Sequence, residues 1–357
     1  MGIRCGRMWG DWSGDSGRSE ALDSGDVLLR FTGMSFSLFR GICGGVFGAL
    51  MIVFSPSVLA VESPSKAAGK GGGIPKAVPV TEKSRKPATG SGGGASASSA
   101  GREGGTEGIA GAPVTRAAAY IVVDAKTGAV LSARNADAKR AVASTQKLLT
   151  ALLVAEKGGL SKKVVIEKSD TLASPTKLNM GVGDEYRRDD LLRILLVKSM
   201  NDVACALARD HSGSVPAFAK AMNAKAAELG MTRSRFVNPN GLPAEGQYST
   251  ARDMSKVALA AYRNSEIRKY VKLKQTQWVP ASGPEVVYDN TNKVLGLLPA
   301  CNGMKTGYTE AAKFCLVSSA KEGGAEVISV VLGDTKPAVW EDSRDLLVWG
   351  LRQRLGK

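Results

Sequence analysis

A helix that is apolar on nearly every side lies in the middle of this sequence. Its apolar side chains follow one another almost without interruption: Leu148, Leu149, Ala151, Leu152, Leu153 and Val154. A helix on a protein surface shows a single apolar stripe, whereas this pattern is typical of a helix enclosed by other elements. We therefore predict a helix over residues 144–156 at the centre of a domain.

Ser144 and Lys147 stand at the beginning of this predicted helix. Residues three apart are neighbours on a helix surface, so the serine hydroxyl and the lysine amine come within hydrogen-bond reach. An exposed lysine has a pKa of about 10.4, but burial and a second nearby cation lower it by several units. Lys147 is therefore a candidate base and Ser144 its candidate nucleophile. The competing interpretation is a capping serine followed by a surface lysine.

Ser-x-x-Lys also occurs at three other places, and their contexts differ. Ser63 lies in a low-complexity stretch, and Ser174 precedes a proline in a polar loop. Ser318 lies in a predicted strand, where alternation points it and Lys321 to opposite faces. Only Ser144 stands at the start of a helix.

Two further motifs accompany this pair. Ser199, Met200 and Asn201 form the only Ser-x-Asn in the chain and precede a predicted helix. Lys305, Thr306 and Gly307 lie on a predicted strand, whereas the second Lys-Thr-Gly, at residues 126–128, occupies a hairpin turn where glycine supplies a positive φ. Taken singly, these side chains would be helix caps and a surface charge; together they indicate an acyl-transfer site.

The chemistry of acyl transfer assigns a role to each of four residues: Ser144, Lys147, Ser199 and Asn201. Ser144 attacks an acyl carbonyl, and neutral Lys147 takes its proton. Ser199 relays a proton onward to the leaving amine. Asn201 holds an amide of the substrate.

The Lys-Thr-Gly strand supplies the other groups. Lys305 pairs with a substrate carboxylate and disfavours protonation of Lys147, while Thr306 adds a hydroxyl. Gly307 lacks the Cβ that would block pairing of the substrate along the strand. The backbone N–H groups of Ser144 and Tyr308 are the predicted oxyanion hole.

Strand patterns occur at both ends of the globular part and helical patterns between them. A hairpin is predicted over residues 120–133, strands over 304–309, 314–320 and 327–332, and a final helix over 340–355. The intervening helices are predicted at 189–197, 202–210, 216–229 and 251–263. This order predicts one antiparallel sheet built from both ends, with a helical subdomain inserted.

The N-terminal third has a different composition. An apolar run over residues 42–54, followed by small residues at Val58 and Ala60, is typical of an export signal cleaved after Ala60. Residues 61–113 are rich in Gly, Ser, Ala and Lys, which predicts a disordered linker. The domains are thus a leader (1–60), a linker (61–113) and a catalytic domain (114–357). Export to the periplasm or cell envelope is expected; a retained leader would instead tether the protein to the inner membrane.

Composition excludes several classes of function. His211 is the only histidine, which removes most Ser-His-Asp arrangements and any zinc site with several imidazoles. The five cysteines are too sparse for a disulfide framework, so Cys205, Cys301 and Cys315 are expected to be buried free thiols. The formal net charge of +15 is dispersed and suits an anionic wall or membrane; no motif indicates nucleic acid.

The combined motifs resemble the low-molecular-mass penicillin-binding proteins, which are serine D-Ala-D-Ala carboxypeptidases and related endopeptidases. The likeness rests on Ser-x-x-Lys at 144–147, Ser-x-Asn-Asp at 199–202 and Gly-x-Lys-Thr-Gly-Tyr-Thr at 303–309, with residues 236–242 and 248–253. It implies the α/β fold of serine β-lactamases and penicillin-binding proteins, with a five-stranded antiparallel sheet flanked by helices. It also implies peptidoglycan stem peptides as substrate, no cofactor or metal, and β-lactams as acylating inhibitors. Gln146 departs from the threonine of many members.

Several functions remain open at this point. The leading hypothesis is a D,D-carboxypeptidase that removes the terminal D-Ala, and the nearest rival is a D,D-endopeptidase that cuts cross-links. A serine β-lactamase is disfavoured because no glutamate stands in an evident Glu-x-x-Leu-Asn setting; Glu245 is only a distant candidate. A wall-binding module with degenerate catalysis is disfavoured by the three intact motifs.

Overall fold

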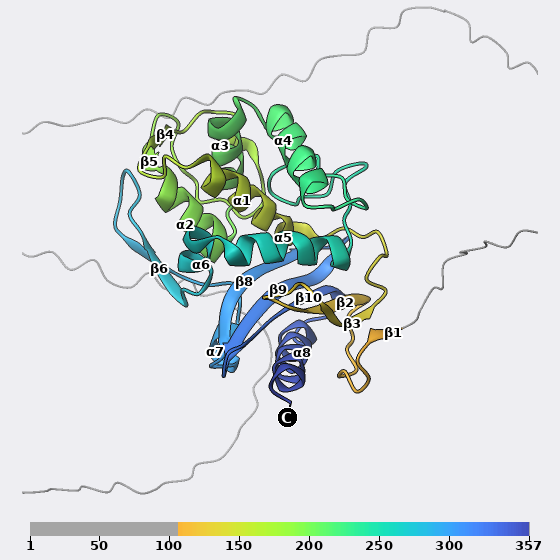
Figure 1. Ribbon diagram of the computed structural model, residues 1–357. Helices are drawn as coiled ribbons and strands as arrows, with labels where there is room; N and C mark the ends of the chain where they lie inside the picture. The colour runs from red at the N-terminus through yellow and green to blue at the C-terminus, as the bar shows by residue number, and fades with distance from the viewer. Residues whose placement is uncertain (1–105, 357) are drawn as a thin grey trace, which may run out of the picture. The chain divides into compact units, whose positions relative to one another are not determined.

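The computed structural model describes residues 106–356 of the chain (Figure 1). The predicted leader, residues 1–60, and residues 61–105 of the predicted linker lie outside this range. The last linker residues, 106–113, are described, and three of them form strand β1, Thr106–Gly108, which pairs with β3. A segment with few apolar residues is not expected to contribute to a hydrophobic core. Its backbone can still pair with a strand at the edge of a sheet.

Within the described residues, six strands form one antiparallel sheet in the order β1-β3-β2-β10-β9-β8. Besides β1 they are β2 (Ala119–Asp124), β3 (Val130–Arg134), β8 (Cys301–Thr309), β9 (Lys313–Glu322) and β10 (Ala325–Asp334). β2 pairs with β10, so strands from the two ends of the domain meet inside the sheet. The predicted sheet is confirmed, and its one additional strand is the short edge strand β1.

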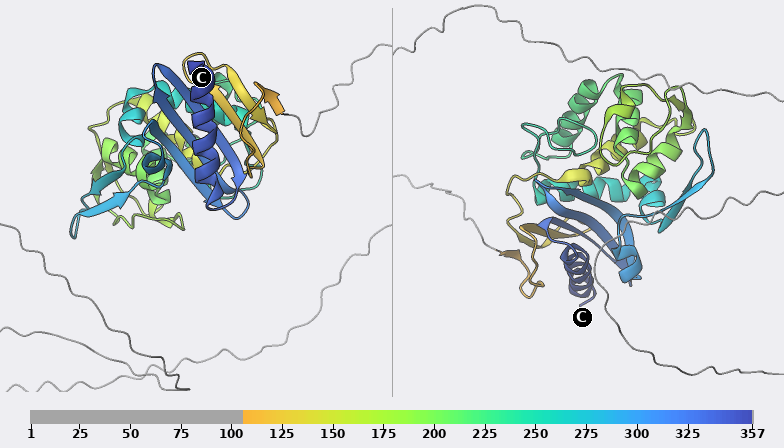
Figure 2. Two further views of the ribbon diagram at one scale, coloured as in Figure 1. Left: turned by 90° about the horizontal axis from the view of Figure 1, so that it is seen from below. Right: turned by 180° about the vertical axis from the view of Figure 1, so that it is seen from behind.

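Both faces of the sheet are covered, because its strands are apolar on both sides. In β2, Ile121 and Val123 belong to one buried cluster, whereas Tyr120 and Val122 belong to another. The second cluster includes the C-terminal helix α8 (Ala338–Leu355), which lies across the sheet (Figure 2). The short helix α7 (Val294–Leu297) adds Val294 and Leu295 to this cluster.

The larger helical part covers the opposite face of the sheet (Figure 1). Its helices are η1 (Ala143–Gln146), α1 (Lys147–Lys157), η2 (Asp170–Leu172), α2 (Arg188–Lys198), α3 (Asn201–Ser212), α4 (Val215–Glu228), α5 (Ala251–Arg263) and α6 (Ser265–Val271). A pair of two-stranded antiparallel sheets accompanies them, β4 (Lys163–Val165) with β5 (Glu185–Arg187), and β6 (Gln275–Trp278) with β7 (Val286–Asp289). The four predicted intervening helices are α2 to α5. Between residues 106 and 356 no helix combines the length and the apolar character that crossing a membrane requires.

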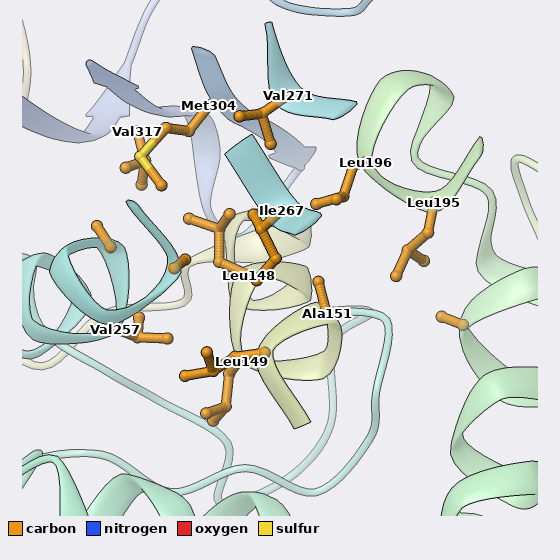
Figure 3. Packing of buried hydrophobic residues seen from close by; sticks show 14 of the residues in the cluster. Leu148, Leu149, Ala151, Leu195, Leu196, Val257, Ile267, Val271, Met304 and Val317 are labelled. Atoms are coloured by element: carbon orange, nitrogen blue, oxygen red, sulfur yellow. The ribbon is translucent and has the colours of Figure 1, made fainter. Parts of the chain in front are cut away.

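Helix α1 is enclosed on all sides, as its sequence predicts. Leu148, Leu149 and Ala151 are each 0% exposed. Figure 3 shows them surrounded by side chains of α2, α5, α6, β8 and β9, including Leu196, Ile267, Met304 and Val317. Each leucine buried in this way contributes roughly 1.5–3 kcal/mol. This packing fixes the beginning of α1 beside the sheet.

Candidate active site

Ser144 and Lys147 lie within hydrogen-bond distance of each other, as predicted. The helix begins at Lys147 rather than at residue 144, and Ser144 lies in the preceding 3-10 turn η1. Lys147 Nζ is 2.8 Å from Ser144 Oγ. Ser144 makes no capping hydrogen bond to the helix, and Lys147 is 0% exposed. Both parts of the competing interpretation, a capping serine and a surface lysine, are therefore wrong.

Lys147 Nζ has two further partners. Asn201 Oδ1 and the backbone carbonyl of Asn240 each lie 2.7 Å away. The orientation of the Asn201 amide is fixed because its Nδ2 donates to the carbonyl of Pro175 at 2.6 Å. Three oxygens therefore surround the buried amine.

Burial, and then the positive charge of Lys305, hold the pKa of Lys147 well below the usual value for lysine. A neutral lysine amine has two N–H groups and one lone pair. In the neutral form, the two N–H groups can be donated to Asn201 Oδ1 and the Asn240 carbonyl, and the lone pair is then free to accept the proton of Ser144 Oγ. The lowered pKa of Lys147 favours this neutral form, which is the form that the predicted role as a base requires.

The loop of residues 238–243 supplies the contact of the Asn240 carbonyl with Lys147, which the sequence did not reveal. The Asn240 carbonyl also lies 3.2 Å from Ser144 Oγ. Gln146 Nε2 donates to the carbonyl of Asn238 at 2.6 Å, and Thr150 Oγ1 donates to that of Pro239 at 2.7 Å, so α1 and η1 hold this loop in place. The composition of the segment predicts a turn but not which carbonyl faces the lysine.

Two glycines allow the turn η1 to pack closely on both sides. A Cβ at Gly241, whose φ is +87°, would overlap the carbonyl oxygen of Ala143. A Cβ at Gly307 would lie 2.7 Å from the backbone nitrogen of Ser144. Real Cβ atoms do not approach other atoms this closely, so glycine is required at both positions. Gly307 therefore makes room for the Ser144 backbone, whereas the sequence predicted that it makes room for the substrate.

Lys305 lies behind the cleft and not on the surface. It is 0% exposed, and its Nζ donates to the carbonyl of Thr306 at 3.0 Å. Burial lowers the pKa of Lys305 to about 7. The Thr306 hydroxyl contacts the hydroxyl of Thr291 at 2.7 Å. The interpretation of Lys305 as a surface charge is wrong, and direct pairing of its amine with a substrate carboxylate stays a prediction.

Ser199 and Asn201 reach the site from the junction of α2 and α3. Ser199 ends α2 in the left-handed conformation, with φ 72°. Among the described residues its hydroxyl has no hydrogen bond to Ser144 or Lys147, so the relay stays a prediction. Both polar atoms of the Asn201 amide are engaged, by Lys147 and by Pro175, so here Asn201 positions the lysine; its predicted contact with a substrate amide stays untested. The buried carboxylate of Asp202 accepts from the backbone of Leu178 and Asn179, which anchors the loop that carries Pro175.

A cleft of about 460 Å³ brings most of these residues together. Its lining consists of Ser144, Pro175, Thr176, Lys198, Ser199, Asn201, Gly241, Leu242, Pro243, Thr291, Thr306, Gly307, Tyr308, Thr309 and Glu310. Lys147 and Lys305 are buried beneath this lining. Tyr308 is 48% exposed at the rim. The backbone of β8 approaches Ser144 at Gly307, next to the predicted oxyanion donor Tyr308.

The remaining sequence candidates lie elsewhere. Ser63 and Lys66 are outside the described residues. Ser318 is buried in β9 and Lys321 is exposed, and Glu245 is exposed and does not line the cleft. His211 is in the last turn of α3, and its ring forms a T-shaped pair with that of Phe218, with 5.1 Å between the centroids. Cys205, Cys301 and Cys315 are buried free thiols, as predicted.

Comparison with known proteins gives consistent matches. Residues 106–336 match the D-alanyl-D-alanine carboxypeptidase family of peptidases. The chain is 34% identical over 222 residues to D-alanyl-D-alanine carboxypeptidase DacF of Bacillus subtilis, covering 61% of this chain and 57% of that protein. It is also 34% identical over 224 residues to a D-alanyl-D-alanine endopeptidase of Pseudomonas aeruginosa, covering 59% and 69%. The match to DacF therefore spans less than two thirds of the length of that relative.

The structure resembles the crystal structure of a D-alanyl-D-alanine carboxypeptidase from Mycobacterium tuberculosis, with a TM-score of 0.65 and 31% identity. The similarity covers 68% of this chain and 95% of that chain. The fold predicted from the sequence motifs is thereby confirmed.

Proposed function

The chain belongs to the D-alanyl-D-alanine carboxypeptidase family of peptidases, and we propose that it removes the terminal D-Ala from peptidoglycan stem peptides through an acyl-enzyme on Ser144. The observation that carries the proposal is the fully buried Lys147 amine, 2.8 Å from Ser144 Oγ and held by Asn201 Oδ1 and the Asn240 carbonyl. A buried lysine whose neutral form faces a serine hydroxyl is an activated nucleophile pair.

The first half of the reaction is an acyl transfer to Ser144. Ser144 Oγ forms a bond to the carbonyl carbon of the penultimate D-Ala, while its proton passes to Lys147 Nζ. The N–H groups of Ser144 and Tyr308 stabilise the oxyanion, each by about 3–4 kcal/mol in comparable sites. The proton then reaches the amide nitrogen through Ser199, the C–N bond breaks, and D-Ala leaves.

The second half repeats the chemistry with water. Departure of D-Ala frees the space next to the acyl ester, and a water molecule that gives its proton to Lys147 attacks the ester carbon. A β-lactam adduct keeps its leaving group attached, so this space stays filled. We therefore propose that benzylpenicillin acylates Ser144 and persists there.

Endopeptidase activity is the second candidate, because the P. aeruginosa relative named above is an endopeptidase with the same 34% identity. The two activities share the acyl-enzyme and differ only in the group that leaves when the scissile bond breaks, a free D-Ala or a second stem peptide.

Digestion of purified muropeptides separates the two functions. We expect the protein to release D-Ala from pentapeptide monomers, detected by mass spectrometry, and to cleave cross-linked dimers slowly. Ser144→Ala is the control: it should abolish peptide cleavage and benzylpenicillin labelling while the fold stays intact, because the Ser144 side chain caps no helix. Faster cleavage of dimers would favour the endopeptidase, and labelling that survives Ser144→Ala would contradict the assignment.

A further inference from the structure

Gln247 follows the loop of residues 238–243 in the chain, and the proposed reaction assigns it no role. Next to it, Tyr248 pairs with Arg235 through two backbone hydrogen bonds, of 2.8 and 3.0 Å, so the chain is held together at the base of the loop. Gln247 is half-buried there and does not belong to the lining of the cleft that residues 106–356 form. Its side chain can therefore act on the reaction only through other residues.

The side-chain amide of Gln247 joins the two ends of this loop. Its Oε1 accepts from the backbone N–H of Val237 at 2.9 Å and from that of Asn238 at 3.1 Å. Its Nε2 donates to the carbonyl of Leu242 at 2.9 Å. A backbone N–H only donates and a carbonyl only accepts, so these contacts also fix the orientation of the amide. One side chain thus closes the loop.

Asn240 lies within the closed loop and presents its carbonyl to the reactive pair. This carbonyl is 2.7 Å from Lys147 Nζ and 3.2 Å from Ser144 Oγ. The Asn240 side chain turns back into the loop, where its Oδ1 accepts from the backbone N–H of Leu242 at 3.0 Å. The direction of a backbone carbonyl is set by the φ and ψ angles of its loop. Closing the loop at its ends therefore fixes the carbonyl beside the lysine.

Gln146, which stands where many members of the family carry threonine, connects this network to the residue before Lys147. The Gln146 side chain is buried, and its Nε2 lies 3.5 Å from Gln247 Oε1 and 2.6 Å from the Asn238 carbonyl. The shorter side chain of threonine would not reach these oxygens from the same backbone position. The two glutamines therefore join the loop to the turn η1, which carries Ser144.

We propose that Gln247 is a positioning residue that keeps the Asn240 carbonyl against Lys147, with Gln146 as its partner on the turn η1. The inference rests on the proposed function and deepens it, because it adds residues that act on the base without contacting the substrate. With the loop closed, the carbonyl can accept one N–H of the neutral amine, and the lone pair is free to take the proton of Ser144. Without the closure, the carbonyl moves away and the amine loses one of the two acceptors that place it.

Gln247→Met tests this role, because methionine has a similar length but no amide. The measurement is acylation of Ser144 by benzylpenicillin, with the dissociation constant of the first, non-covalent complex separated from the acylation rate constant. We expect the rate constant to fall roughly tenfold or more, since the base is displaced, while the dissociation constant changes little. Rates are referred to the molecules that labelled benzylpenicillin titrates, so unfolded protein does not count. Gln277→Met, at an exposed position of β6, is the matched control.

The pH dependence of acylation separates positioning from a general loss of structure. A carbonyl oxygen stabilises an ammonium more than a neutral amine, so its withdrawal lowers the pKa of Lys147 further. In Gln247→Met the rising limb of the rate constant against pH should therefore move to lower pH, below a reduced plateau. A loss of structure that leaves the carbonyl in place would reduce the number of titrated molecules and leave the limb where it is.

Gln146→Met is the second variant, because it removes the other side chain of the pair. It should move the limb in the same direction, and the double variant should lose less than the product of the two single losses, since both residues act on one loop. A limb that stays in place in both single variants, or a loss that Gln277→Met shares, would overturn the proposal. If the wild-type protein is acylated but releases no D-Ala from muropeptides, the carboxypeptidase proposal fails, while the limb still decides the role of Gln247.

Discussion

Burial and residues that are remote in sequence together lower the pKa of Lys147 and hold its amine in place. Asn201 Oδ1 and the Asn240 carbonyl accept its two N–H groups, and Lys305 lies close enough for its charge to lower the Lys147 pKa. The charge of Lys305 favours the neutral amine over the ammonium, and the two oxygen acceptors fix the position of the nitrogen beside Ser144 Oγ. A reactive lysine is therefore a property of four segments of the chain.

Replacing Lys305 should shift the pH dependence of acylation. Its positive charge lowers the pKa of Lys147, so Lys305→Gln raises that pKa and reduces the neutral fraction of Lys147 at a given pH. The rising limb of kcat/KM against pH is therefore expected to move to higher pH. Rates of benzylpenicillin acylation between pH 5 and pH 9 measure this shift. Lys272→Gln, at an exposed lysine that follows α6, is the control. An unshifted limb with weaker binding alone would show that Lys305 acts only on the substrate.

Among the secondary-structure elements, the turn η1 is held between the loop of residues 238–243 and strand β8. Gly241 lies against the Ala143 carbonyl and Gly307 against the Ser144 nitrogen. The two contacts fix the peptide of Ser144, the proposed nucleophile, from opposite sides. Gln146 and Thr150 hold the loop in turn, so loop, turn, helix and strand form one rigid unit.

Gly307→Ala should disturb this unit. The added methyl would lie 2.7 Å from Ser144 N, and such overpacking costs roughly 1–3 kcal/mol. We expect a fall in Tm of about 5 °C and a loss of roughly a hundredfold in the acylation rate, because the nucleophile is displaced. Gly296→Ala is the control, since no atom lies within 4 Å of its added Cβ. Normal acylation in Gly307→Ala would mean that the turn can shift without displacing Ser144.

In the domain as a whole, the site lies where the helical part meets the sheet. Ser144 comes from η1, Ser199 and Asn201 from the junction of α2 and α3, and Thr306 from β8. The covered faces of the sheet keep β8 in place, with α7 on one side and η1 and α6 on the other. Residues 1–105 lie outside the described range, and the proposal that they direct export rests on their sequence.

The export proposal is tested on protein isolated from cells. The apolar run over residues 42–54 and the small residues Val58 and Ala60 predict cleavage after Ala60. N-terminal sequencing should therefore give a mature protein that begins near Val61. A first residue upstream of Arg40 would instead indicate a retained leader and a membrane tether.

Features that depend on local spacing can be predicted from the order of residues alone. Apolar residues on every side of α1 predict its enclosure, and alternation predicts the sheet strands, because these patterns repeat within a few residues. The Ser144–Lys147 pair is three residues apart and lies within hydrogen-bond distance as expected, although Ser144 lies in the turn η1 and not in the helix itself. Elements as short as α7 and β4 contain too few residues to show a period, and the sequence did not reveal them.

The way in which the nucleophile is held depends on tertiary contacts. The Asn240 carbonyl faces Lys147 across 93 residues of sequence, and Gly307 approaches Ser144 from the far end of the domain. Every residue has a backbone carbonyl, so no side-chain pattern marks the one that binds the lysine. The contact between the hydroxyls of Thr291 and Thr306 also depends on tertiary structure. Thr291 lies in the loop before α7, and its backbone N–H donates to Val197 near the end of α2, which holds the loop in position. Such contacts depend on the packing of whole elements, which is fixed by the two hydrophobic cores and not by the residues in contact.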